Sequence, residues 1–231
     1  MSKLEWSEVF QRNARCRPLE DLVEPTWDLV KKAIKDGDTG EALELLDYCY
    51  FEGRNYYDSL MSMTDTLLTL LAESAGEEAI ERNWRSRYSA RAIEILARCD
   101  TVEKDLQRIT EGHRGHFADI TMTEEPDRYV IKCDPCGSGG QMRRNVDAGV
   151  TKKAYPWTWN KVGVPYYCTH CCVALEILPI EIRGYPVCVI DIADKPEDPC
   201  FQHFYKSPDL IPEEYFTRIG KKKDASKFKR G

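Results

Sequence analysis

The first 117 residues repeat apolar positions at the three-to-four-residue spacing of amphipathic helices. This spacing predicts helices over about residues 24–37, 38–71, 74–99 and 100–112. Gly37 stands where the first of these helices should end, and Gly112 where the last should end. Four amphipathic helices joined by short turns are expected to pack as an antiparallel bundle over residues 1–117.

From Ala118 onward the pattern shifts towards the alternation that is typical of strands. One hairpin is predicted over residues 118–131, and its second strand leads directly into Cys133. A second antiparallel pair is predicted from residues 173–178 and 187–192, around a turn at 183–186. The expected fold class is α+β, with a helical bundle (1–117), a smaller antiparallel β domain (118–206), and a terminal helix with a basic tail (207–231).

The segment between residues 137 and 167 has glycines and prolines but few periodic apolar residues, so it predicts a long ordered loop. A loop of about 30 residues inside a folded domain needs something to anchor it. The segment also carries large aromatic side chains, among them Trp157 and Tyr167. These rings are expected either to cover the bundle or to form the wall of a cavity.

Ten cysteines are many for a chain whose first residues lack the apolar stretch of a secretion signal. Five of them fall as Cys133-x-x-Cys136 and as Cys168-x-x-Cys171-Cys172. In a reducing, cytoplasmic compartment, clustered thiols favour a metal site over disulfides. We expect Cys133, Cys136, Cys168 and Cys171 to hold one ion, which would anchor both ends of the long loop.

This arrangement resembles the four-cysteine sites of zinc-ribbon and rubredoxin-like proteins over about 40 residues, although Cys172 stands where such knuckles usually have glycine. Paired CxxC spacing favours tetrahedral zinc. An iron–sulfur cluster is the rival interpretation, and thiol redox chemistry ranks last because no thioredoxin-like context precedes Cys133. The alternative of a purely structural zinc, with four cysteine ligands and no role beyond stabilising the β domain, is also compatible with the sequence.

The histidines suggest that the metal has a catalytic role in addition to a structural one. His113 and His116 precede the first predicted hairpin, His170 lies inside the second knuckle, and His203 follows Cys200. A closed site of four thiolates needs none of these groups, whereas a catalytic zinc keeps a position open for water. The candidates for proton transfer or nucleophilic attack are His116, His170 and Cys172. The roles of His113, Cys200 and His203 stay open.

A glycine-rich stretch, residues 137–145, follows the first knuckle and ends in Arg143 and Arg144. Paired arginines can bind a carboxylate or phosphate through two parallel hydrogen bonds. The stretch does not match the P-loop pattern. We expect these two arginines to bind a substrate anion, with Trp157 and Tyr167 as apolar walls.

Charge and composition narrow the class of protein. With 42% hydrophobic and 31% charged residues, the sequence is that of a folded globular protein. No apolar run reaches the roughly 18 residues needed to cross a bilayer. The net charge is −6, and without the basic tail from Lys221 to Gly231 it is −11. Such an acidic body disfavours nucleic acid as a partner.

Two hypotheses from different classes follow. The first is a zinc-dependent hydrolase or lyase that acts on a small, anionic and partly apolar compound bound between the helical bundle and the metal-binding domain. The second is a non-catalytic module that binds a small molecule or a protein and contains a purely structural zinc. An exposed face of the bundle could also form a homo-oligomer.

Overall fold

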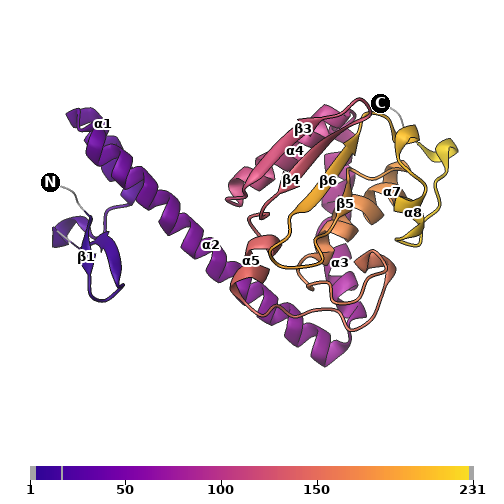
Figure 1. Ribbon diagram of the computed structural model, residues 1–231, viewed down its shortest axis with the longest axis horizontal. Helices are drawn as coiled ribbons and strands as arrows, with labels where there is room; N and C mark the ends of the chain where they lie inside the picture. Colours follow the sequence, from indigo (N-terminus) through magenta and orange to yellow (C-terminus); the bar gives the residue numbers. More distant parts are fainter. Residues whose placement is uncertain (1–3, 17, 229–231) are drawn as a thin grey trace. The chain divides into compact units, whose positions relative to one another are not determined.

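The computed structural model describes residues 4–16 and 18–228. The chain separates into two compact units, residues 1–57 and 58–231, and the division falls inside the longest helix, α2 (Thr39–Ala75) (Figure 1). The sequence-based boundaries after residues 117 and 206 stay predictions.

The smaller unit begins with an antiparallel hairpin, β1 (Leu4–Ser7) and β2 (Arg12–Arg15), which the apolar pattern did not predict. A 3₁₀ turn, η1 (Leu19–Asp21), leads to the predicted helix α1 (Thr26–Asp36). That helix ends at Gly37, whose φ of 79° lies in the left-handed region that glycine adopts without strain. Leu29 and Val30 of α1 bury against Leu45 of α2 to form the core of this unit.

The larger unit contains a four-stranded antiparallel sheet in the order β3-β4-β6-β5. Its strands are β3 (Ile120–Glu124), β4 (Arg128–Cys133), β5 (Val189–Asp191) and β6 (Cys200–Tyr205). The predicted first hairpin is confirmed, because β3 and β4 pair in register from Ile120 opposite Cys133 to Glu124 opposite Tyr129. Strand β6 then places Cys200 opposite Cys133.

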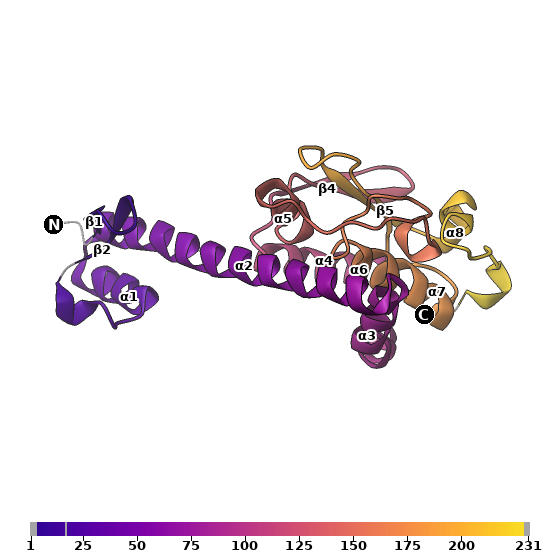
Figure 2. The ribbon, with the colours of Figure 1, turned by 90° about the horizontal axis from the view of Figure 1, so that it is seen from below.

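Helices α3 (Glu78–Arg98) and α4 (Val102–Gly115) follow the predicted spacing and lie with α6 (Thr169–Cys171) on one side of this sheet (Figures 1 and 2). A short helix, α5 (Gly139–Asn145), and a 3₁₀ turn, η2 (Pro156–Thr158), interrupt the long loop. The loop is therefore partly helical.

The prediction of a strand at residues 173–178 is wrong. Helix α6 continues as a π-helical stretch, η3 (Cys172–Ile177), and then as α7 (Leu178–Arg183), which ends at Gly184. A short apolar run has the same appearance in a buried strand and in a buried helix, so its periodicity cannot separate the two. Of the predicted pair, the second strand, expected at residues 187–192, is present as β5.

The predicted helices do not share one bundle core. In the larger unit, side chains of α2, α3 and α4 pack into a core that also contains the sheet and residues 157–192. The fold is therefore α+β as expected, and in the larger unit the helices pack into a core that they share with the sheet.

The C-terminal segment folds back on the larger unit. It contains η4 (Pro208–Leu210), the predicted terminal helix α8 (Glu214–Thr217), and η5 (Ala225–Lys227). Phe216 and Ile219 are buried, and Lys221 forms an ion pair with Glu181 at 2.6 Å. Part of the predicted basic tail, residues 229–231, lies outside the described residues.

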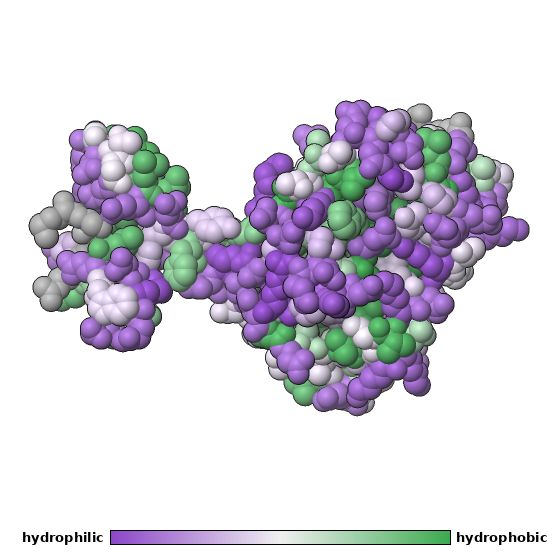
Figure 3. Space-filling model, in the orientation of Figure 1, coloured by the Kyte–Doolittle hydropathy of each residue, from purple (hydrophilic) through white to green (hydrophobic). Residues whose placement is uncertain are grey.

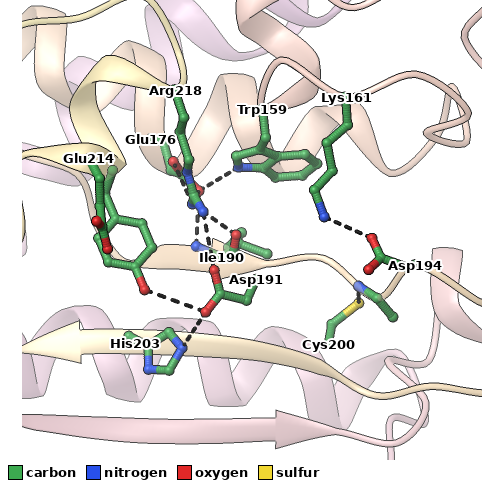
Figure 4. A network of polar contacts seen from close by, with 12 residues as sticks. Trp159, Lys161, Glu176, Ile190, Asp191, Asp194, Cys200, His203, Glu214 and Arg218 are labelled. Carbon is green, nitrogen blue, oxygen red and sulfur yellow. Dashed lines mark hydrogen bonds and ion pairs between the residues drawn. The ribbon is translucent and has the colours of Figure 1, made fainter.

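Glu176 connects four segments of the larger unit through its carboxylate (Figure 4). One oxygen, Oε1, accepts hydrogen bonds from Trp159 Nε1 at 2.7 Å and from the Ile190 amide at 2.9 Å. The Arg218 guanidinium lies 3.1 Å from the same oxygen. Because the Glu176 side chain is fully buried, this network fixes η3 to the long loop, to β5 and to the C-terminal segment.

Within the described residues, no helix is both long enough and apolar enough to pass through a membrane. Polar residues cover most of the face of the larger unit that Figure 3 shows, and apolar residues appear there in small groups.

Candidate functional site

A cavity of about 370 Å³ lies in the larger unit, where α3 and α4 face η3 and strands β5 and β6. Most of its surface is formed by apolar side chains from these elements and from the long loop, namely Ala92, Ile95, Leu96, Ile109, Trp159, Ala174, Leu175, Val187, Ile190 and Ile192. Such a volume and such a lining are typical of a site for a small, largely apolar molecule.

Four thiols line the same cavity: Cys136, Cys168, Cys171 and Cys200. The fold thus brings Cys136 of the first predicted pair to both members of the second, although 31 residues separate Cys136 from Cys168 in the sequence. Cys133 does not line the cavity. It is buried at the end of β4, with its Sγ atom 3.8 Å from His113 Nε2.

The start of helix α5 holds the two pairs together. The Gly140 amide donates a hydrogen bond to Cys136 Sγ at 2.9 Å. A Cβ atom on Gly139 would lie only 2.6 Å from Cys168 Sγ. Glycine at position 139 is therefore required for the close approach of α5 to Cys168.

Burial raises the pKa values of Cys133, Cys168, Cys171 and Cys200 above the ordinary range, and the nearby thiol of Cys136 raises each of them further. Without a cation these thiols are protonated at neutral pH. A bound metal ion would reverse this balance, since a coordinating thiol loses its proton.

In the structure as described for residues 4–16 and 18–228, no three or more His, Cys, Asp or Glu side chains are arranged so that they could hold a metal ion. The thiols are the soft donors that zinc and iron–sulfur clusters prefer, but the predicted set is not a ready-made coordination site. Metal binding stays a prediction.

Three of the four histidines line the cavity: His113, His116 and His170. Burial lowers the pKa of each imidazole, in the case of His170 to about 4. All three rings are therefore neutral at neutral pH. His170 Nδ1 lies 2.7 Å from the Tyr167 carbonyl oxygen, which can only accept, so Nδ1 carries the proton. Its Nε2 lone pair lies 3.4 Å from Cys171 Sγ.

Strand alternation explains why His203 is not part of this site. Cys200 and Gln202 point to the cavity side of β6, and His203 points to the other side, as successive residues of a strand do. There, His203 Nε2 lies 3.0 Å from Asp191 Oδ2.

Three other predicted residues also lie outside the cavity lining. Cys172 is buried, and its thiol points to the Pro156 carbonyl at 3.6 Å. Trp157 is buried and stacks on Tyr155. Tyr167 packs edge-on against His170, which is itself a residue of the cavity wall.

Arg143 and Arg144 bind the chain's own backbone. Arg143 donates to the carbonyl oxygens of Ala193, at 2.9 Å, and Lys195. Arg144 donates to the carbonyls of Pro196 and Glu197 and pairs with Asp134 at 2.8 Å. Both guanidinium groups thus position the loop before β6, and their binding of a substrate anion stays a prediction.

Sequence reasoning placed the site beside the helical bundle but did not name the helical residues that line the cavity. Tyr88, Arg91, Ala92 and Ile95 line it from α3, and Arg108 and Ile109 from α4. The three-to-four-residue spacing places each set on one helix face. Arg91 and Arg108 are the two charged side chains that these faces bring to the cavity.

Comparisons of the chain with protein-family models, with curated proteins and with solved structures find no match.

Proposed function

We propose that the larger unit is a zinc-dependent enzyme of the hydrolase or lyase type, which acts on a small, anionic and partly apolar compound bound in this cavity. The observation that carries the proposal is the composition of the cavity wall. Thiols and neutral imidazoles gather on one cavity that is otherwise apolar. A purely structural metal site would not need an adjoining cavity of this size.

The proposed zinc ligands come from the cysteine cluster. Cys136, Cys168 and Cys171 line the cavity and belong to the predicted set. Two further thiols are candidates for the ligand set: Cys133, which the CxxC pattern predicts, and Cys200, which lies opposite it in the ladder and lines the cavity. A catalytic zinc takes three protein ligands and keeps its fourth position for water or substrate, so we expect at least one of these two thiols to be dispensable for zinc binding.

When bound, such an ion would supply Lewis acidity or an activated water. The chain's own residues would place the substrate. The apolar side chains of α3 and η3 hold its apolar part and exclude water. His116 and His170 lie in the same wall as the thiols and are the proposed groups for accepting or donating a proton. The proposal omits Cys172 because its thiol points to the Pro156 carbonyl.

The second candidate function is a non-catalytic module that binds a small molecule or a protein and contains a purely structural zinc. It is favoured by the apolar side chains that form most of the cavity wall, because these can hold a ligand without any chemical step. Turnover separates the two candidates, because the module needs no group for proton transfer.

Zinc content is expected to be about one ion per chain and to fall below about a tenth of that in Cys136→Ser and Cys171→Ser, because each removes a thiolate ligand. Cys188→Ala is the matched control, since Cys188 is a buried thiol that does not line the cavity. Elemental analysis measures the metal, and the absorption spectrum separates colourless zinc from coloured iron. Wild-type protein without zinc, or full zinc in both serine variants, would overturn the metal assignment.

Ligand binding is expected to disappear when the cavity is filled. Ala92 lines the cavity from α3, so Ala92→Trp places an indole in the space that a ligand needs. Ala90→Trp is the matched control, because Ala90 is exposed on the same helix. Calorimetry with 2-naphthamide, a neutral aromatic probe, should show binding to the wild type and to the control but not to Ala92→Trp. Equal binding to all three would place the ligand elsewhere.

A further inference from the structure

The formal charges that face the cavity are all positive. Its lining residues include Arg91 and Arg108 but no aspartate or glutamate. The charge of the cavity lining thus differs from that of the whole chain, which has 39 acidic residues against 33 basic ones. Arg91 and Arg108 are therefore the lining side chains that a negative group of a ligand can pair with.

The Arg108 guanidinium has a hydrogen-bond donor that no described group of the chain accepts. Its Nε atom is buried without a hydrogen-bond partner, and its nearest carboxylate, Asp105, lies 3.8 Å away. Asp105 is itself engaged by Arg183 at 2.6 Å, so one carboxylate stands against two guanidinium groups. These three side chains, with Arg108 half-buried, therefore carry one net positive charge beside the cavity.

Arg91 lies one helical turn from Tyr88 and from Ile95 on the cavity face of α3, and it is exposed. Its position on this face places a second guanidinium at the edge of an apolar cavity. Arg143 and Arg144, the pair that the sequence favoured, donate to backbone carbonyls instead.

We propose that Arg91 and Arg108 bind the negative group of the ligand, and that the ligand is an organic carboxylate whose apolar part lies along α3, α4 and η3. A guanidinium matches the planar carboxylate through two parallel hydrogen bonds. The apolar lining excludes a compact, highly charged anion such as a nucleotide phosphate, for which two arginines offer too little compensation. This inference rests on the proposed function, because it assigns the specificity of the same cavity.

The test compares 2-naphthoate with 2-naphthamide, two probes of the same shape that differ in charge. Calorimetry on the full chain should show tighter binding of the carboxylate, by about tenfold or more, which is typical of a hydrogen bond between charged groups. Arg91→Gln and Arg108→Gln should each remove about tenfold of the affinity for 2-naphthoate and leave the affinity for 2-naphthamide unchanged. Higher salt should weaken only the carboxylate.

Two further variants keep the result interpretable. Arg82→Gln removes the same charge from an exposed position of α3 that does not line the cavity, and it should leave both affinities unchanged. Arg108→Lys keeps the charge beside Asp105 and the fold, but loses the planar pair of donors, so it should bind 2-naphthoate less tightly than the wild type.

The outcomes separate this inference from the proposed function. If both probes bind with equal affinity and Ala92→Trp blocks both, the cavity site stands and the arginine assignment is overturned. If neither probe binds to the wild type, the cavity site fails and the inference fails with it. Inorganic phosphate that binds more tightly than 2-naphthoate would also overturn the carboxylate assignment.

Discussion

Glu176→Ala is expected to lower the free energy of unfolding by about 3–5 kcal/mol, the usual cost of breaking a buried ion pair. The substitution leaves Arg218 without the carboxylate at 3.1 Å and leaves Trp159 Nε1 and the Ile190 amide without an acceptor. Trp159 and Ile190 both line the cavity, so ligand binding should weaken together with stability. Denaturant unfolding and 2-naphthamide calorimetry measure the two effects.

The matched control for this prediction is Glu181→Ala. Glu181 is also paired, with Arg85 at 2.9 Å and with Lys221 at 2.6 Å, but its side chain is 35% exposed. Pairs with this much solvent contribute about 0–1 kcal/mol, so the control should lose far less stability. Equal losses in the two variants would show that burial of Glu176 is not what makes its network important.

Gly137→Ala is expected to cost about 3 kcal/mol and to displace the thiol wall of the cavity. A Cβ atom on residue 137 would lie 1.7 Å from the His116 carbonyl oxygen and 2.7 Å from the Ala118 amide nitrogen. Both are backbone atoms, which cannot rotate away as a side chain could. The chain must therefore separate the turn that carries Cys136 from the segment that carries His116.

Gly115→Ala is the control for Gly137→Ala, because a Cβ atom on Gly115 meets nothing within 4 Å. Gly115 is the last residue of α4, where alanine should be neutral or stabilising by up to about 1 kcal/mol. Zinc content and thermal unfolding of the two variants should differ clearly. A fully stable Gly137→Ala protein with normal zinc would mean that these two segments do not approach as closely as the structure has them.

The sequence predicted only part of the candidate site. The CxxC spacing singled out Cys136, Cys168 and Cys171, all of which line the cavity. It could not show that Cys200 joins them, because that depends on β6 pairing with β4 in the register that sets Cys200 opposite Cys133. The contacts of the arginines also depend on a segment that is distant in the sequence. Arg143 and Arg144 looked free in the sequence, but the loop at residues 193–197 returns to bind them.

Local sequence determined those parts of this protein in which the neighbours along the chain supply the decisive interactions. Helix α1 with its end at Gly37, the hairpin of β3 and β4, and the terminal helix α8 all follow from spacing and turn residues within a few positions. Tertiary structure decided the rest. Residues 172–183 became helical, and Arg91 and Arg108 came to face an apolar cavity, through contacts with segments far away in the chain. Such contacts leave no periodic pattern, because the partners that stabilise them lie elsewhere in the sequence.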